Sequence, residues 1–407
     1  MISSASDAGI ASNSYDIVVI GAGPSGSLCA RNLASRGYRV LLAEKRPVVG
    51  IPVRCGEATG RRSRLSRFMT VNEDYIETDL NGVILHGPGG VSVRYDQDDV
   101  GLMIDRALFD QDVARQAQRA GAELRVSTRI EAISPVKDGV RELTIVDEPT
   151  KARSVITAKM VVGADGAEAL SGRWVGLKTR QLPPQVCSAI ELRVEAMDAN
   201  PNHLTFWQGH ESVNKGYVWV FPKLKSKVVN LGSGVLTPKL GEKNMYDLSM
   251  EYKQRLFPGA KVAEVHGGAV PVSGNLEEYV ADRFLLCGDA AHHTNPLTGG
   301  GIISGILGAE IASEWIDKGF RMGDLSREFL KQYEVECWEQ FGKNHRRQMR
   351  IRDFVVELTP EAQTAFYGIF KGMVDGELSL PAKVVGYARM LGLAASNWKV
   401  TRKAFFT

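Results

Sequence analysis

Short apolar runs alternate with helical patterns at the start of the chain. Tyr15–Ile20 is a β-branched apolar run that glycine ends, and Tyr38–Ala43 is a second one. Between them, Ser27–Gly37 has the pattern of a helix stopped by glycine. Apolar strands without polar alternation are typical of a parallel sheet buried on both faces. The pattern therefore predicts a β–α–β unit of a doubly wound α/β fold.

The same alternation returns further along. A helix is predicted from about Ile104 to Ala120, where Leu108, Val113 and Ala117 recur at helical spacing, and 123–126 follows as a strand. Two more apolar runs, 161–164 and 283–287, each lead into an acidic glycine turn. A helix rich in small residues is predicted after the second turn, from Ile302 through Ala312.

The middle segment has a different pattern. Strand-like runs at 189–194, 216–222 and 227–232 are separated by Asn and Gly, which favours a mixed sheet. In the second run Tyr217, Trp219 and Phe221 alternate with valine, so all three aromatic rings belong to one face of the strand. That face is interpreted either as a surface packed on the core or as the wall of an apolar pocket, and both stay open on the pattern alone.

Composition removes several classes of protein. The chain has 407 residues, and 50 basic against 47 acidic residues give a net charge of +3, so no strong field favours nucleic acid. The five cysteines form no Cys-x-x-Cys pair and no Cys/His cluster, which argues against a zinc site and a disulfide framework, and no metal site is expected. We expect a cytoplasmic protein, with no signal peptide, no membrane-spanning segment and a disordered tail over residues 1–14.

The first candidate site is the turn Gly21-Ala22-Gly23-Pro24-Ser25-Gly26. Gly21 permits the tight turn, Gly23 lets the backbone approach a pyrophosphate, and Gly26 lets helix and strand pack closely. Pro24 opens the helix whose N-terminus faces the phosphates. Glu44, 18 residues after Gly26, is placed to bind the adenosine ribose. The strand, turn, helix and acid together predict a dinucleotide site.

Two later motifs identify the dinucleotide. Asp165-Gly166 and Gly288-Asp289 both follow predicted strands, and Gly299, Gly300, Gly301 and Ile302 open a helix. An acid at a strand end can bind ribityl hydroxyls, and helix-start amides can face the flavin pyrimidine, where negative charge grows on reduction. In this order the motifs resemble the FAD-binding fold of the aromatic hydroxylase superfamily. The resemblance implies FAD as cofactor and adds Lys45, Arg106 and Val126 to its contacts.

Two short segments resemble a narrower group. Pro52-Val53-Arg54-Cys55-Gly56-Glu57 and the aromatic strand 216–222 are similar to the geranylgeranyl reductase family, in particular its archaeal lipid-saturating branch. The resemblance runs over about residues 15 to 370. It implies that Arg54, Cys55 and Gly56 lie beside the flavin, that Cys55 is catalytic, and that a polyprenyl pocket is built from Tyr217, Trp219, Phe221 and Pro222.

Other interpretations of these residues stay open. A free cysteine is usually a small buried hydrophobe, although Arg54 and the loop glycine favour a partly exposed Cys55. Orienting the alkene, tuning the flavin and relaying a proton are its alternative roles. His292 and His293 follow the last acidic turn and are tempting acids, but we expect them to be structural or near the flavin rim.

The expected architecture is a discontinuous FAD-binding domain, an inserted mixed β-sheet substrate domain and a helical C-terminal region. The FAD-binding domain comprises 15–80, 104–178 and 275–330. The substrate domain comprises 81–103 and 179–274, and the C-terminal region comprises 331–407.

The expected function is reduction of C=C bonds in geranylgeranyl chains of archaeal ether lipids, with an external electron donor such as NAD(P)H or ferredoxin. The rivals are a flavin monooxygenase or halogenase of the same superfamily and a non-enzymatic prenyl-binding escort protein. Lys343–Arg352 is basic, and Trp398–Phe406 mixes cations with aromatic rings. These segments suit attachment to the inner face of an anionic membrane, or else form a solvated helix face and a frayed end.

Overall fold

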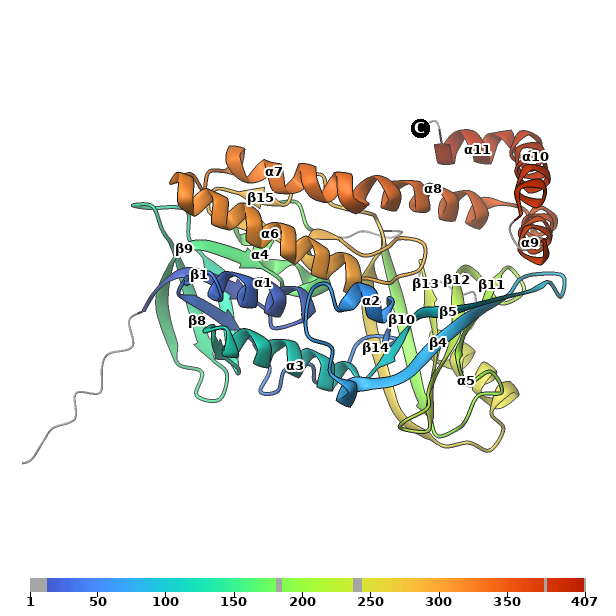
Figure 1. Ribbon diagram of the computed structural model, residues 1–407, viewed down its shortest axis with the longest axis horizontal. Helices are drawn as coiled ribbons and strands as arrows, with labels where there is room; N and C mark the ends of the chain where they lie inside the picture. The colour runs from blue at the N-terminus through green and yellow to red at the C-terminus, as the bar shows by residue number, and fades with distance from the viewer. Residues whose placement is uncertain (1–12, 181–184, 237–243, 377–378, 406–407) are drawn as a thin grey trace, which may run out of the picture.

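The protein, described by a computed structural model over residues 13–180, 185–236, 244–376 and 379–405, has two sheets with helices packed around them (Figure 1). Residues 1–12 of the predicted disordered tail lie outside the described residues. Ser14 already begins the first strand, β1 (Ser14–Ile20).

The first sheet has the order β15-β16-β9-β1-β2-β6, and its four central strands, with β6, are parallel. Two further strands, β7 and β8, form an antiparallel extension from β9. The bounds are β2 Val40–Ala43, β6 Glu123–Arg125, β7 Thr128–Ile133, β8 Arg141–Asp147, β9 Arg153–Gly163, β15 Val280–Ala281 and β16 Phe284–Leu286. The doubly wound α/β fold predicted from the apolar runs is confirmed.

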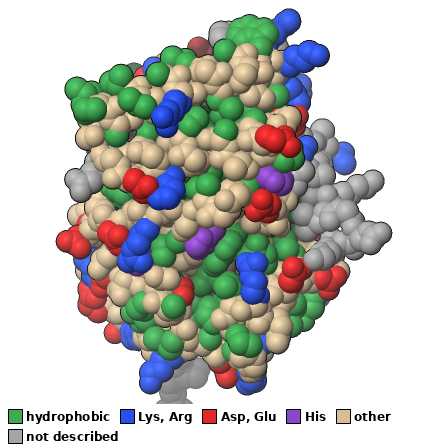
Figure 2. All heavy atoms as spheres, turned by 90° about the vertical axis from the view of Figure 1, so that its right-hand side faces the viewer, with side chains coloured by type: hydrophobic (Ala, Val, Ile, Leu, Met, Phe, Trp, Pro, Cys, Tyr) green, Lys and Arg blue, Asp and Glu red, His purple; other side chains and the backbone are tan. Residues whose placement is uncertain are grey.

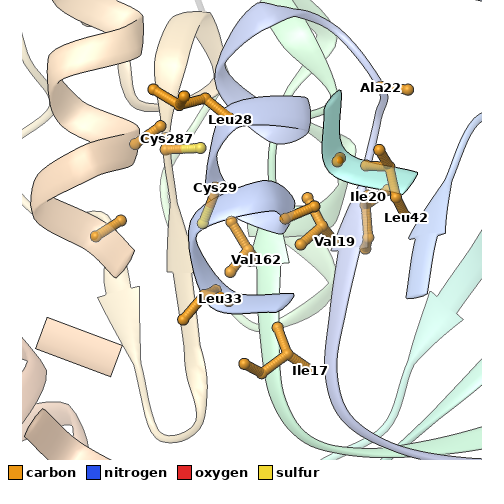
Figure 3. Packing of buried hydrophobic residues seen from close by; sticks show 14 of the residues in the cluster. Ile17, Val19, Ile20, Ala22, Leu28, Cys29, Leu33, Leu42, Val162 and Cys287 are labelled. Atoms are coloured by element: carbon orange, nitrogen blue, oxygen red, sulfur yellow. The ribbon is translucent and has the colours of Figure 1, made fainter. Parts of the chain in front are cut away.

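One face of this sheet is covered by α1 (Pro24–Ala34), α3 (Arg106–Arg119) and α6 (Ile302–Met322), with α1 packed between the other two (Figure 1). Leu28, Cys29 and Leu33 of α1 pack among strand residues that are almost completely buried, as Figure 3 shows. Consecutive strand residues such as Val18 and Val19 are both fully buried, so both faces of the sheet are covered, which explains why the strands carry apolar residues without alternation.

Several predicted boundaries differ from the observed ones. The first helix begins at Pro24 and ends at Ala34, because proline fits the first turn of a helix, whose amides need no partner there. The helix predicted to end at Ala312 continues to Met322, where Gly323 adopts φ +71° and stops it. The small residues at the start of α6 indicated only its first turns. The helix continues because Ile316, which is fully buried, extends its apolar face beyond Ala312.

The second sheet has the order β14-β10-β13-β12-β11-β4-β5-β3, and only β11 and β4 pair in parallel. Its strands are β3 Ala58–Thr59, β4 Ile76–His86, β5 Ser92–Ile104, β10 Val186–Val194, β11 His203–Gly209, β12 Val213–Lys223, β13 Val228–Val235 and β14 Val262–Pro271. Strand β3 and the start of β4 fall inside the range 15–80 that the sequence assigned to the FAD-binding domain. They join this sheet because they pair with β5.

The two faces of the second sheet have different neighbours. Leu192, Val194 and Leu231 pack against α5 (Met245–Leu256) on one face. Trp219 and Phe221 face the other way, toward Leu80 and Met103. The aromatic face of β12 therefore points away from α5.

The C-terminal region is helical. The helices are α7 Arg327–Cys337, α8 Lys343–Glu357, α9 Pro360–Asp375, α10 Leu380–Ser396 and α11 Trp398–Phe405. Helices α7 and α8 run along the molecule, α9 and α10 lie beyond the end of α8, and α11 turns back to pack on α8 (Figure 1). Among the described residues, no helix has both the length and the hydropathy needed to cross a membrane.

Candidate active site

The predicted cofactor motifs meet at one edge of the first sheet. Ile20 at the end of β1 pairs with Gly163 of β9 and with Ala43 of β2, and Gly163 pairs with Leu286 of β16. The glycine turn, Glu44, Asp165 and Asp289 follow these strand ends directly. Because ligands of open α/β sheets bind at the carboxyl ends of the strands, this edge is the expected dinucleotide position.

The glycine turn has the geometry that a pyrophosphate requires. Gly21 has φ +100°, and a Cβ there would lie 2.4 Å from the carbonyl oxygen of Ala164. A Cβ on Gly26 would lie only 2.0 Å from the Gly21 carbonyl oxygen, so helix and strand pack without room for a side chain. A Cβ on Gly23 would meet no described protein atom within 4 Å. The open space is where a bound group can approach the backbone, and these residues fit FAD.

Glu44 lies against this turn. Its carboxylate accepts hydrogen bonds from the backbone N–H of Ala22 at 3.0 Å and of Arg46 at 3.0 Å. Lys45 points elsewhere, toward Glu168 in the turn after β9, at 2.9 Å. Val126 is exposed, just beyond β6. The structure thus brings Glu44 to the turn, while the roles of Lys45 and Val126 stay predictions.

Two acidic turns complete the same edge. Asp165 accepts hydrogen bonds from the N–H and the hydroxyl of Ser171, at 2.9 and 2.7 Å, so its carboxylate fixes the start of the following helix α4 (Leu170–Trp174). Asp289 accepts one from the Thr294 hydroxyl at 2.8 Å. A Cβ on Gly301 would lie 2.9 Å from the Asp289 carboxylate, so Asp289 contacts the loop that opens α6.

The loop containing Cys55 is fixed to the second sheet by Glu57. The buried Glu57 Oε2 accepts hydrogen bonds from Lys223 at 2.9 Å, Arg193 at 2.8 Å and Asn230 at 2.7 Å. Its Oε1 accepts one from the backbone N–H of Arg106 at 2.9 Å. Burial opposes ionisation of Glu57, but Lys223, the Arg106 amide and Arg193 hold its pKa below the usual range.

Cys55 is half-buried and borders a cavity. Its sulfur accepts a hydrogen bond from the Glu57 N–H at 3.2 Å. Burial raises the pKa of the thiol although the nearby Arg106 lowers it, so the thiol is protonated at neutral pH. Arg106 itself is held by both carboxylate oxygens of Asp110, each at 2.9 Å.

A second connection joins the α6 loop to the second sheet. The Tyr217 hydroxyl donates a hydrogen bond to the carbonyl oxygen of Thr298 at 2.6 Å. A Cβ on Gly299, which has φ +73°, would lie 3.1 Å from the same hydroxyl. The loop of Gly299, Gly300, Gly301 and Ile302 is thereby held opposite the Cys55 loop, and both border the same cavity.

The cavity has a volume of about 1050 Å³. It begins between these two loops, follows the aromatic face of β12 and reaches α9. Its wall is predominantly apolar and includes Tyr217, Trp219, Phe221, Phe206, Phe366 and Phe370. Arg54, Cys55 and Gly56 line it as well, and a Cβ on Gly56 would lie 3.1 Å from the Phe221 ring.

Pro222 is not in this wall. Strand alternation turns it to the opposite face of β12, and its carbonyl oxygen accepts a hydrogen bond from Thr78 at 2.8 Å. The structure therefore does not bring Pro222 together with the three aromatic side chains.

Sequence analysis missed Glu191. This residue of β10 is buried in the cavity wall beside Gly56, and its Oε2 accepts a hydrogen bond from the Trp219 indole N–H at 3.1 Å. Burial, together with the negative charge of Glu57, raises the pKa of Glu191 to about 8. The available signal was strand alternation, which puts Glu191 on the same face as Ala189 and Arg193, opposite the apolar face of Ile190, Leu192 and Val194.

His292 and His293 are both buried and do not line this cavity. His292 shares a hydrogen bond of 2.7 Å with Ser273, and burial lowers its pKa to about 4. Burial also lowers the pKa of His293 to about 3, and its ring packs against Tyr279 and Phe341. Their surroundings are those of core residues.

Fold and site together define an FAD-dependent oxidoreductase. The FAD binding domain family matches residues 14–224, and the geranylgeranyl reductase catalytic domain family matches residues 185–270. A digeranylgeranylglycerophospholipid reductase of Methanosarcina acetivorans is 35% identical over 332 residues, 80% of this chain and 81% of the relative. One from Methanocella arvoryzae is 34% identical over 375 residues, 91% of this chain and 94% of the relative.

Solved structures agree with this class. A geranylgeranyl bacteriochlorophyll reductase-like protein from Thermoplasma acidophilum is 26% identical, with a TM-score of 0.85 over 95% of this chain and 99% of its own. A flavin-dependent brominase, 18% identical, has a TM-score of 0.72 over 96% and 100%, and shares the fold alone. The chain belongs to the geranylgeranyl reductase family, and its cofactor is FAD.

Proposed function

We propose that this flavoenzyme saturates C=C bonds in the geranylgeranyl chains of archaeal-type ether glycerophospholipids. The observation that carries the proposal is the cavity of about 1050 Å³, whose apolar wall starts at Cys55 and the Gly299–Ile302 loop and continues to α9. A chain of isoprene units needs a long apolar channel with one end at the reacting group. The names of the relatives in Methanosarcina and Methanocella support this substrate class.

The residues around Cys55 suit reduction of an isolated double bond. Bound FAD, once reduced, supplies the hydride. The aromatic face of β12 holds the chain, and the loops on either side of the cavity exclude water from the reacting carbons. Cys55 borders the cavity, and in this proposal it meets the chain at the flavin, where its protonated thiol contacts the alkene without carrying a charge into an apolar cavity.

The external donor that reduces the flavin is NAD(P)H or a ferredoxin in this proposal. The described residues contain one glycine turn of the dinucleotide type, and FAD occupies it in our account. Anaerobic reduction of the bound flavin by each donor, followed by its visible absorption, distinguishes the two.

A membrane surface is the proposed source of the lipid. Helix α10 exposes large apolar side chains along its length, with Leu380 exposed at 76% and Leu391 at 71%. Val384 and Tyr387 lie between them at helical spacing, and Lys383 and Arg389 flank the stripe. Helix α9, which packs on α10, lines the cavity. Figure 2 shows this end of the molecule, where hydrophobic side chains lie open between scattered charges. Such a surface suits insertion at the level of lipid head groups.

The basic segments at the C-terminus contribute unequally to such a surface. Arg352 of α8 is turned inward and donates a hydrogen bond to the carbonyl oxygen of Pro296 at 3.2 Å. Phe405 of α11 packs on Phe354 with ring centroids 5.9 Å apart, whereas Trp398 is exposed. A frayed end was one of the two interpretations of the C-terminal segment, and the structure shows the helix α11 over Trp398–Phe405 instead.

The proposal is tested in cells that make unsaturated archaeal-type ether lipids and also produce this chain. Mass spectrometry of their lipids is expected to show gains in steps of two hydrogens per chain. Oxygenated or halogenated lipid products, or unchanged lipids in the presence of a flavin that the cell keeps reduced, would contradict it. The first result favours the monooxygenase and halogenase rivals, and the second favours the escort protein.

A further inference from the structure

Glu191 occupies a defined position in the wall of the cavity. Its strand neighbours are Gly232 on β13 and His266 on β14, so these residues form one row across the sheet with Trp219. A Cβ on Gly232 would lie 2.2 Å from the Trp219 ring. The glycine therefore lets the indole lie flat across β13 and reach the Glu191 carboxyl.

The carboxyl lies next to the Cys55 loop. A Cβ on Gly56 would be 3.7 Å from Glu191 Oε2, and Cys55, Gly56 and Glu191 all line the cavity. Glu191 is only 4% exposed. Its Oε2 accepts the indole N–H, while its Oε1 has no hydrogen-bond partner among the described residues. Buried polar atoms without a hydrogen-bond partner are rare in native proteins, so the Oε1 atom at the surface of the cavity calls for a functional explanation.

The charges around Glu191 favour its protonated form. The two cations that face this region, Arg193 and Lys223, both bind Oε2 of Glu57. Glu57 and the Cys55 thiol face Glu191 from the loop, and His266 faces it from β14, where it binds Glu264 at 2.9 Å. The nearest full negative charge is therefore that of Glu57. Burial and that charge raise the Glu191 pKa to about 8, so the carboxyl carries a proton at neutral pH.

Saturating an isolated alkene needs this kind of group. The double bond has no carbonyl to stabilise a carbanion, so a proton must arrive with the hydride or before it. We infer that Glu191 is the proton donor to the alkene, which rests on the proposed function.

The step balances as follows. The O–H bond of the Glu191 carboxyl breaks and a C–H bond forms at one alkene carbon, while the other carbon takes the hydride that reduced FAD supplies. The alkene is reduced by two electrons, the flavin is oxidised, and Glu191 is left as a carboxylate. A proton from solvent restores the acid before the next turnover, and His266, paired with Glu191 across the strands and bound to the half-exposed Glu264, lies on that side of the row.

A purely structural role for Glu191 is the alternative, in which it serves only to hold the Trp219 indole. Glu191→Gln separates the two roles, because the amide oxygen still accepts the indole hydrogen bond but the side chain has no acidic proton. Glu191→Asp is a second variant that keeps a carboxyl group, and it covers the case in which the amide of Glu191→Gln disturbs the packing of the cavity wall. Glu195→Gln is the matched control: Glu195 lies just beyond β10, is half-exposed and pairs with Lys261.

The experiment uses the FAD-loaded enzyme, reduced without oxygen and mixed with vesicles of a digeranylgeranyl glycerophospholipid. Flavin oxidation and product mass are followed from pH 6 to pH 10, and infrared spectra in H₂O and D₂O record protonated carboxyl groups. FAD content and melting temperature are measured for each variant.

We expect Glu191→Gln to slow the alkene-dependent oxidation at least about 100-fold, the usual range for a general acid, with FAD content unchanged. The rate of flavin oxidation in the parent enzyme should stay constant below about pH 8 and fall tenfold for each pH unit above it, because Glu191 loses its proton there. The rate in Glu191→Gln should not show this pH dependence. The carboxylic acid band that shifts in D₂O should vanish in Glu191→Gln and persist in Glu195→Gln. Glu191→Asp should keep the fall above neutral pH at a reduced rate.

The inference is overturned if Glu191→Gln oxidises its flavin as fast as the parent enzyme, or if both proteins show the same carboxylic acid bands. Either result leaves the proposed function intact. A parent enzyme that never passes electrons to the lipid overturns the proposed function, and the inference with it.

Discussion

The hydroxyl of Tyr217 donates a hydrogen bond of 2.6 Å to the carbonyl oxygen of Thr298. It joins β12 of the second sheet to the loop that opens α6, which are 81 positions apart in the chain. The loop is predicted to face the cofactor, and the strand is proposed to face the substrate. This hydrogen bond ties the strand directly to the loop.

Tyr217→Phe removes this hydrogen bond and keeps the ring. We expect a loss of about 1 kcal/mol in the free energy of unfolding, because the Thr298 carbonyl loses its partner. The α6 loop should also hold FAD less tightly. Denaturant unfolding and FAD titration measure the two effects. Unchanged values of both would show that the contact does not fix the loop.

The glycine turn offers a matched pair of substitutions. Gly26→Ala places a methyl group 2.0 Å from the Gly21 carbonyl oxygen and should cost about 1–3 kcal/mol of stability even without cofactor. Gly23→Ala meets no described protein atom, and φ −71° at this position suits alanine. Gly23 is the N-cap of α1, where glycine is preferred to alanine, but alanine also lowers the entropy of the unfolded chain, so the variant should keep apoprotein stability within about 1 kcal/mol.

FAD binding distinguishes the two variants further. Gly23→Ala should weaken FAD binding at least about tenfold, because its methyl group fills the space where a pyrophosphate approaches the backbone. Titration of apoprotein with FAD measures this. A Gly23→Ala protein that binds FAD as tightly as the parent would place the pyrophosphate elsewhere.

Cys55 tests the catalytic assignment. Cys55→Ala removes a side chain that contacts and positions the alkene, so it should lower the single-turnover rate of alkene reduction by about 10- to 100-fold while leaving the flavin bound and reducible. The FAD content and the rate of reduction by dithionite serve as internal controls. An undiminished single-turnover rate would remove Cys55 from the catalytic residues.

Helix α10 tests the membrane proposal. Leu391→Glu replaces an exposed apolar side chain with a charge and should weaken partition onto anionic vesicles about tenfold, since burying a leucine is worth roughly 1.5–3 kcal/mol. Met322→Glu is the matched control, equally exposed at 71% but at the end of α6 distant from α10 (Figure 1). Vesicle flotation at low salt measures both. Equal flotation of the two variants and the parent would contradict docking through α10.

The local motifs of this protein could be predicted from sequence because their chemistry is contiguous. A glycine turn after an apolar strand, an acid at the end of the next strand and an acidic turn after a third all follow from short stretches. Parallel strands then place these turns at one edge, as Ile20, Gly163 and Leu286 do.

The other half of the site depends on strand register and could not be predicted in the same way. Glu191 approaches Trp219 only because Gly232 lies between them in a three-strand row, and no pattern within one strand specifies that row. Glu57 was visible in its motif, yet its partners Arg193, Lys223 and Asn230 come from three strands of the second sheet. Pro222 was assigned to the pocket from the family resemblance, although strand alternation puts it on the face opposite the aromatic side chains.

The central claim is that reduced FAD in this protein passes its electrons to the double bonds of a geranylgeranyl lipid. The most direct measurement is an anaerobic single turnover, in which the reduced enzyme is mixed with digeranylgeranyl glycerophospholipid vesicles, with saturated vesicles as control. We predict that the absorption of oxidised flavin returns with the unsaturated lipid alone, and that the product is heavier by two hydrogens for each flavin oxidised. A flavin that stays reduced with both lipids, or one that is oxidised only when oxygen is admitted, would contradict the account.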